Sequence, residues 1–442
     1  MPSRRSTRSA CCATEPLSAV ISIAAIVIVA ALFLLLLFEP GLPYRVSPSR
    51  ERLDSRAFVN YLSAIVNARL FAAGELEVLS SGAAIYAAEL EAMRAARRSI
   101  HLEVYLFLRG RAGDEVLRVL TERARAGVAV RIVVDRIGSL FTPYSYFRQL
   151  RAAGAHVHWY QPIAWYTLKR FNNRTHRDIL VVDGEVAFLG GVGVADFWVG
   201  PPGRGRPWRD TMVRVKGDLV KGLQTSFAEN WLEAAGEVLL ETEFSEREGE
   251  PLRAYQPDGR VGMVVNSTPS AGRATRARLL FQVLLASARE SIHICSPYFL
   301  PDRSLMAELE RAARRGVPVI ILTPGKWNNH PITRLASRRR YGRLLGAGAE
   351  IYEYQPAMIH AKVFIVDRRW SVVGSTNFDN RSFGLNDEVN LAVLDPRLAE
   401  LLERDFAADL AAARAITLDE WRRRSYGERA LAFGARLLER QV

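Results

Sequence analysis

A histidine and a lysine two residues apart are the first candidates for chemistry in this chain. His360 and Lys362 precede Val363–Val366, a short apolar run between polar residues that predicts a buried strand. Alternate residues of a strand share a face, so we expect the imidazole and the ammonium to point the same way. Such a pair suits a phosphoryl group, with the imidazole as nucleophile or acid and the ammonium as countercharge.

Further polar residues follow a short distance along the chain. Ser375 and Asn377 lie on a glycine-led loop after a second predicted strand, Trp370–Val373, and could donate hydrogen bonds to phosphate. Glu388 follows at a distance that suits a return strand. A carboxylate behind an imidazole fixes its tautomer and raises its basicity, so we expect Glu388 to support His360.

An incomplete second copy of this pattern lies upstream. The segment from Thr175, THRDILVVDGEVAFLGG, matches the segment from Ile359, IHAKVFIVDRRWSVVGS, and three earlier pairs of segments match in the same order. Four ordered matches indicate a duplicated unit of somewhat under 200 residues. Each unit alternates helices and strands, which predicts an α/β layer with helices packed on a mixed sheet.

Residues 359–390 closely resemble the HKD signature of the phospholipase D superfamily, because they contain H-x-K-x4-D followed by G-S-x-N. Three further runs, SPYFLPD, EIYEYQP and NFDNRSF, are similar to bacterial cardiolipin synthases. The resemblance covers roughly residues 75 to 400. It implies duplicated phospholipase D-like α/β sandwich lobes that share one active site on a pseudo-twofold axis.

The resemblance also implies a reaction. Two imidazoles at one phosphorus suit a double displacement through a phosphohistidine intermediate. We expect a membrane-bound phosphatidyltransferase that forms cardiolipin from the anionic lipid phosphatidylglycerol, without a cofactor. A hydrolytic phospholipase D, a phospholipase D-like nuclease and a catalytically impaired lipid-binding protein are the alternatives.

The site residues that the resemblance implies fall into groups. The catalytic group is His176, His360, Lys362, Asp210 and Glu388, with His176 as nucleophile and His360 as acid and base. The phosphate-binding group is Lys362, Ser375, Asn377 and Gly191. Asp183 and Asp367 are interpreted as structural, because a carboxylate at the far end of the motif strand is better placed to tie loops than to reach phosphorus.

The first copy departs from the family pattern at two positions. Asp178 replaces the lysine and Gly193 replaces the asparagine. A carboxylate ~5 Å from a phosphodiester costs roughly 3 kcal/mol at an effective dielectric near ~20, which would slow the reaction. Arg177 cannot substitute for the lysine, because strand alternation points it to the opposite face. The nearby cations Lys169, Arg170 and Arg174 could neutralise Asp178 or replace the missing ammonium, and the sequence leaves both open.

The N-terminal part reads as a membrane anchor. Residues 17–38 carry no charge and, as a helix, are long enough for the ~30 Å hydrocarbon core. No cleavage site follows, so we expect an uncleaved single-pass helix in the cell membrane, which in a bacterium is the inner membrane. Arginines flank both ends almost equally, so the side of the catalytic part is undetermined.

The predicted domain organisation follows from these features. The segments are a basic tail (1–16), the transmembrane helix (17–38), a juxtamembrane segment (39–74), the first lobe with its degenerate motif (75–240), a linker (241–260), the second lobe with the intact motif (261–415) and a basic amphipathic C-terminal helix (416–442). That last helix could lie on lipid or against the protein's own surface.

Composition restricts the partners. The 442 residues carry a formal net charge of +13, which indicates attraction to polyanions, and the anchor favours a membrane over nucleic acid. The histidines and cysteines lack zinc-like spacing, so no metal site is expected. Cys295 is interpreted as an inert core residue.

Overall fold

The computed structural model describes residues 15–37, 45–165, 170, 172–200, 206–239, 254–255, 258–270, 275–425 and 427–428. The chain divides into two compact units, residues 1–42 and 43–442. The first contains helix α1 (Glu15–Leu37). No helix within the described ranges has both the length and the apolar character needed to cross a membrane. Most of the predicted linker and residues 429–442 of the predicted C-terminal helix lie outside these ranges.

The second unit is a mixed α/β fold with two sheets. The seven-stranded sheet has the order β2 (Glu75–Leu79), β9 (Met212–Lys216), β8 (Val186–Gly190), β7 (Asp178–Val182), β3 (Ser99–Val104), β4 (Ala129–Asp135) and β5 (His156–Tyr160). The ten-stranded sheet has the order β1 (Leu70–Ala72), β10 (Val261–Ser267), β16 (Asn386–Leu394), β15 (Trp370–Gly374), β14 (Val363–Val366), β11 (Ile292–Cys295), β12 (Val319–Pro324), β13 (Glu350–Tyr354) and β17 (Ala413–Ile416), with β6 (Arg174–Thr175) added to β16.

The predicted duplication is visible in the strand order. In the first sheet β3, β4 and β5 are parallel and β7 joins β3 antiparallel; in the second, β11, β12 and β13 are parallel and β14 joins β11 antiparallel. Strands β7 and β14 carry the two motif copies, and each then pairs antiparallel with the next strand along the chain. The strand predicted over Val363–Val366 is β14, and that predicted over Trp370–Val373 is β15.

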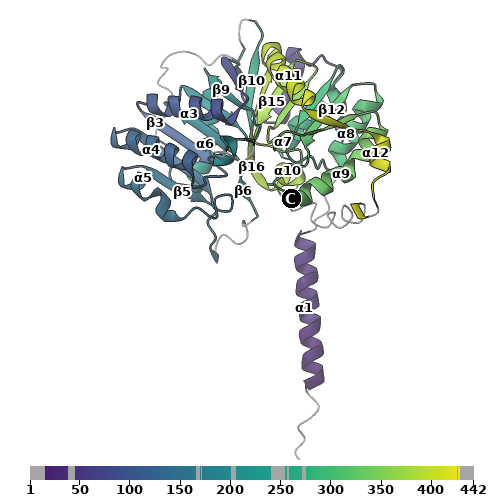
Figure 1. The fold of residues 1–442 in the computed structure, drawn as a ribbon, viewed down its shortest axis with the longest axis horizontal. Coiled ribbons are helices and arrows are strands. Elements are labelled where there is room, and N and C mark those ends of the chain that lie inside the picture. The colour runs from purple at the N-terminus through teal and green to yellow at the C-terminus, as the bar shows by residue number, and fades with distance from the viewer. Residues whose placement is uncertain are drawn as a thin grey trace, which may run out of the picture. The chain divides into compact units, whose positions relative to one another are not determined.

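Helices cover both faces of each sheet. On the outer face of the first sheet lie α3 (Gly82–Ala95), α4 (Arg111–Arg125), η1 (Tyr144–Phe147) and α5 (Arg148–Ala152). On the outer face of the second lie α2 (Arg56–Ile65), α7 (Arg276–Ser287), α8 (Arg303–Arg314) and α9 (Pro331–Gly346). Figure 1 shows α3, α4 and α5 at one side of this unit and α8, α9 and α12 (Leu418–Arg422) at the other.

A third core lies between the two sheets. Helices α6 (Leu219–Ala235) and α11 (Pro396–Ala411) contribute Leu223 and Leu402 to it. Alternate residues of the motif strands divide between cores: Ile365 faces this inner one, whereas Phe364 faces the outer one. Because both faces are buried, these strands read as continuous apolar runs. Cys295 is buried in the same inner core, as its sequence context indicated.

The beginning of the predicted C-terminal helix packs on the protein's own surface. Trp421 of α12 donates a hydrogen bond from its indole to the backbone oxygen of Arg338 on α9, at 2.8 Å. A Cβ at Gly342 would lie 2.3 Å from the Trp421 ring, so the absence of a side chain there lets the indole approach α9. Of the predicted C-terminal helix, the described part therefore packs on protein.

The two carboxylates interpreted as structural close equivalent turns. Asp183 accepts hydrogen bonds from the backbone N–H groups of Arg98 (2.7 Å) and Ser99 (2.9 Å), and Asp367 does so from Glu290 (2.7 Å) and Ser291 (3.0 Å). Both residues have positive φ, 54° and 53°. Each carboxylate therefore ties the end of a motif strand to the start of the neighbouring strand, far from the histidine end.

Substituting Asp367 with alanine should lower the free energy of unfolding by about 3 kcal/mol, because buried N–H groups lose their acceptor. Denaturant unfolding of the full chain in detergent measures this change. Glu185→Ala is the matched control, since that side chain is 61% exposed and the change should stay within about 0.5 kcal/mol. Equal effects of the two substitutions would contradict the structural role of Asp367.

Candidate active site

The two motif histidines are attached by their backbones to the opposite lobe. The N–H of His176 donates to the backbone oxygen of Asp387 at 2.9 Å, and the N–H of His360 donates to the backbone oxygen of Arg209 at 2.7 Å. Each of these acceptors immediately precedes a site carboxylate, Glu388 or Asp210. The two hydrogen bonds are therefore equivalent and run in opposite directions between the lobes, as a pseudo-twofold relation requires.

This arrangement exchanges the expected carboxylate partners. Glu388 lies 3.1 Å from Nδ1 of His176, and Asp210 lies 2.9 Å from Nδ1 of His360. The expectation that Glu388 supports His360 is therefore wrong. The physical reason is that the backbone of each histidine is hydrogen-bonded to the residue just before the carboxylate of the other lobe, which brings that carboxylate beside the imidazole.

The surroundings of His176 and Glu388 favour the ionic form of the pair. Burial opposes ionisation of both groups, but their attraction outweighs it, raising the pKa of His176 and lowering the pKa of Glu388. Ser375 donates its hydroxyl proton to Glu388, and Asn386 donates to the same carboxylate at 3.3 Å. Ser375 is fully buried behind Glu388, so it orients the carboxylate, whereas the sequence placed it on the phosphate.

The surroundings of His360 have the opposite effect. Burial and the nearby Lys362 ammonium lower the pKa of His360 to about 4, although Asp210 acts against them. The Lys362 nitrogen lies 3.0 Å from Nε2 of His360. Asp210 is held in turn by the Trp198 indole at 3.1 Å and by the N–H of Thr211 at 2.8 Å. The two imidazoles of the site therefore have pKa values displaced in opposite directions.

Lys362 also reaches the first half-site. A Cβ at Gly191 would lie 2.6 Å from the Lys362 nitrogen, so the glycine leaves room for the ammonium in its present position. Burial lowers the pKa of Lys362, while Asp210, Asp178 and Glu388 raise it in part. One lysine from the second lobe thus interacts with the acids of both half-sites.

Asp178 is buried beside these groups. Burial raises its pKa to about 6, while the charges of His176 and Lys362 hold the rise back. Its Oδ1 accepts a hydrogen bond from the N–H of Tyr105 at 3.1 Å. A Cβ at Gly193 would lie 3.4 Å from that oxygen and 2.8 Å from the backbone oxygen of Leu106. The two departures of the first motif are thus neighbours in space.

Of the first-lobe cations considered as partners of Asp178, Arg174 is paired elsewhere, Arg170 is exposed at the surface and Lys169 lies outside the described residues. Arg174 is buried and its guanidinium lies 3.6 Å from Asp135. Arg177 points toward α6, where it lies 3.2 Å from Glu229, so the predicted opposite orientation is confirmed. Lys169 falls among the residues that the structure does not describe.

A cavity of about 420 Å³ opens onto both histidines. The sequence-predicted residues in its lining are His176, His360, Asp178, Gly191 and Asn377. Lining residues that were not nominated from the sequence are Tyr105, Leu106, Ile137, Gly138, Trp198, Trp208, Tyr298, Asn329, His330, Thr333, Asp379, Arg381, Ser382 and Asn386. The runs SPYFLPD and NFDNRSF, which carry the family resemblance, contain four of these residues, Tyr298, Asp379, Arg381 and Ser382, and were the signal for them.

Two polar groups of this lining are notable. The Oδ1 atom of Asn377 is buried without a hydrogen-bond partner in the described part of the chain. Burial raises the pKa of Asp379 to about 7. An unsatisfied amide and a carboxyl group that is easily protonated are both able to interact with a polar ligand in the cavity.

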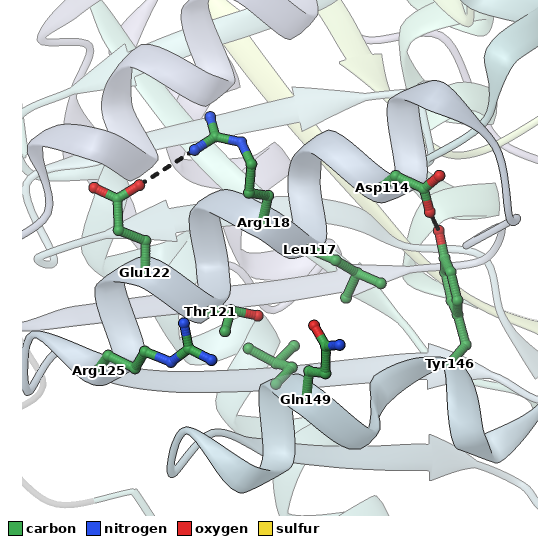
Figure 2. A pocket seen from close by; sticks show the side chains of 9 residues that line it. Asp114, Leu117, Arg118, Thr121, Glu122, Arg125, Tyr146 and Gln149 are labelled. Carbon is green, nitrogen blue, oxygen red and sulfur yellow. Dashed lines mark hydrogen bonds and ion pairs between the residues drawn. The ribbon is translucent and has the colours of Figure 1, made fainter.

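A larger hollow, of about 620 Å³, lies on α4 and α5, and its lining contains no histidine. Figure 2 shows its polar side chains paired with one another: Tyr146 with Asp114, at 2.7 Å, and Arg118 with Glu122, at 3.4 Å. The cavity at the histidines is therefore the candidate active site. Among the described residues, no cluster of three or more histidine, cysteine, aspartate or glutamate side chains could hold a metal ion.

Similar solved structures have this architecture. A phosphatidylserine synthase from Haemophilus influenzae aligns with a TM-score of 0.70 at 16% identity, over 87% of this chain and 99% of that one. A polyphosphate kinase from Porphyromonas gingivalis aligns with a TM-score of 0.52 at 12% identity, over 90% and 57%. At these identities the likeness concerns the fold. The fold and the paired half-sites define a phospholipase D-like protein.

The sequence comparisons identify the family. The model described as "Cardiolipin synthase, PLD-like domain" matches residues 90–196 and 282–410, so the chain belongs to this family. A cardiolipin synthase from Halalkalibacterium halodurans is 34% identical over 82% of this chain and 71% of its own length. Cardiolipin synthase A from Pseudomonas fluorescens is 36% identical over 84% and 77%. Membership of this family indicates that the protein is a cardiolipin synthase-like phosphatidyltransferase of the phospholipase D type.

The exchanged partners can be tested by titrating the histidines with NMR. Glu388→Gln should lower the pKa of His176, because the imidazolium loses its counterion, and should affect His360 little. Asp210→Asn should lower the pKa of His360 instead. A fall at His360 in Glu388→Gln would show that the carboxylates pair within their own lobes.

Proposed function

We propose that this protein transfers a phosphatidyl group from phosphatidylglycerol to the glycerol hydroxyl of a second phosphatidylglycerol, forming cardiolipin and releasing glycerol. The observation that carries the proposal is the pair of imidazoles on one cavity, each supported by a buried carboxylate of the other lobe. The donor and the acceptor are inferred from cardiolipin, the product that appears in the names of the similar proteins. The shared Lys362 supplies a positive charge for the phosphodiester.

The reaction proceeds in two displacements. One imidazole nitrogen attacks phosphorus, the bond from phosphorus to the glycerol oxygen breaks, and the other imidazolium gives its proton to that oxygen. The neutral imidazole then removes the proton of the incoming hydroxyl. That oxygen attacks phosphorus, the bond from nitrogen to phosphorus breaks, and the first histidine is restored.

The charges of the free site favour His360 as the attacking imidazole. Its pKa of about 4 keeps it neutral at neutral pH, whereas Glu388 raises the pKa of His176 and so favours the protonated form that can act as the acid. A phosphate oxygen in the cavity would take over the hydrogen bond from Lys362 and free Nε2 of His360. This order is the reverse of the one that the family resemblance implies.

Labelled phosphatidylglycerol tests the function and the order together. His176→Ala and His360→Ala should each reduce cardiolipin formation about a thousandfold or more. Alkaline quenching during turnover should trap labelled phosphate on His360, and label on His176 would establish the other order. The assay resolves cardiolipin from phosphatidic acid and runs with a chelator present. Phosphatidic acid as the sole product would indicate hydrolysis, and unreacted lipid would indicate the impaired lipid-binding protein.

Asp178 weakens the site, and replacing it with lysine should raise turnover. The change removes a negative charge near the phosphodiester and adds a positive one, and Gly193 has no side chain to obstruct it. A gain of about 3 kcal/mol would correspond to about a hundredfold. Asp178→Asn, which removes only the charge, should give a smaller increase. Lower turnover in Asp178→Lys would show that the carboxylate is needed, through its position beside His176 and Lys362.

We further propose that residues 17–38 anchor the protein in the cell membrane as a single-pass helix, in a bacterium the inner membrane. The uncharged sequence of this segment supports the proposal. Deletion of residues 1–38 followed by membrane fractionation tests it. Undiminished association through high-salt washing would assign membrane binding to another part of the chain.

A further inference from the structure

Three loops carry large apolar side chains that are exposed to solvent. Phe141, in the loop after β4, is 88% exposed; Trp165, in the loop after β5, is 85% exposed; and Trp327, in the loop after β12, is 53% exposed. Smaller apolar neighbours, Leu140, Ile163 and Ile332, are also exposed. Exposed aromatic residues on three separate loops of a folded unit indicate an interaction surface.

Two of these loops line the active-site cavity, and the third contacts one of its lining residues. The loop after β4 contributes Ile137 and Gly138 to the cavity lining, and the loop after β12 contributes Asn329 and His330. The loop after β5 contains Asn172, whose side chain accepts a hydrogen bond at 2.9 Å from Arg381, another lining residue. All three loops leave the carboxyl ends of parallel strands, which lie at one edge of each sheet.

Cations accompany the aromatic side chains. The Lys326 ammonium lies 5.2 Å from the centre of the Trp327 ring. The Arg136 guanidinium lies 5.2 Å from the Tyr144 ring, in the same loop region as Phe141. Aromatic rings beside lysine and arginine are the combination that favours the interface of an anionic bilayer, where rings enter the boundary and cations meet phosphates.

We infer that Phe141, Trp165 and Trp327, with Lys326 and Arg136, form a docking rim that seats the cavity mouth on an anionic phospholipid bilayer. The inference rests on the proposed function, because a lipid substrate must leave the bilayer to reach the histidines. A protein partner on the same rim would cover the mouth that the substrate uses. A seated rim instead brings headgroup phosphates to the level of the cavity.

Tryptophan fluorescence can test the docking of the rim directly. Trp159, Trp198, Trp231 and Trp370 are buried, whereas Trp165 and Trp327 are exposed. In vesicles of phosphatidylglycerol and phosphatidylethanolamine with brominated acyl chains, the full-length protein should lose fluorescence by short-range quenching. The double variant Trp165→Phe with Trp327→Phe should lose most of this quenching, and Trp421→Phe, on α12, should retain it. Quenching that is absent, or equal in all three proteins, would overturn the inference.

A rate comparison separates docking from catalysis. The quantity to compare is the rate on phosphatidylglycerol in vesicles divided by the rate on monomeric short-chain phosphatidylglycerol. In the triple variant Phe141→Ser, Trp165→Ser and Trp327→Ser, this ratio should be about tenfold lower than in the unchanged protein. Val238→Ser is the matched control, because Val238 is 72% exposed and outside these loops, and its ratio should stay the same. An unchanged ratio in the triple variant would overturn the inference. If the unchanged protein turned over neither lipid while quenching followed the expected pattern, the proposed function would fail and the docking rim would stand.

Discussion

The structure depends on an exchange of carboxylates between the lobes. Glu388 of the second lobe pairs with His176 of the first, and Asp210 of the first pairs with His360 of the second. All four side chains are buried, so removing one partner from the pair of His176 and Glu388 would leave a buried charge uncompensated, a loss of about 3–5 kcal/mol. The same contacts that join the lobes therefore position the imidazoles. A change that loosened the lobe interface would also disorder the catalytic groups.

Strand geometry explains why the exchange takes this form. The strands that carry the histidines begin at the lobe interface, and the carboxylates lie one residue beyond the backbone oxygens that receive the histidine N–H groups. The inner core, with α6 and α11, fixes how the sheets face each other and hence the separation of the two half-sites. The other end of each motif strand is closed by Asp183 or Asp367. Each strand is thus held at both ends by a carboxylate.

Much of the fold and part of the site could be predicted from the sequence. The apolar runs gave β14 and β15, the repeat gave the matching strand orders, and alternation placed Arg177 away from the cavity. The carboxylate partners could not be predicted, because spacing along the chain reports contacts within a lobe, whereas these contacts join residues about 150 or more positions apart. Ser375 was misplaced for a related reason: a loop position does not reveal whether a hydroxyl faces the ligand or the carboxylate behind the histidine.

The charge balance of the site accounts for its asymmetry. The pKa of His176 is raised and the pKa values of Glu388 and Asp210 are lowered, so all three favour their charged forms, whereas the pKa of His360 falls to about 4. Asp178 is a third acid beside the single lysine Lys362, and a phosphodiester would add a further negative charge. Because Asp178 has a pKa raised to about 6, it can take up a proton more readily than an ordinary aspartate when an anion arrives. A site with an aspartate in place of one of the two lysines can thus still admit a phosphodiester, provided that Asp178 takes up a proton. This requirement for a proton distinguishes it from a site with both lysines.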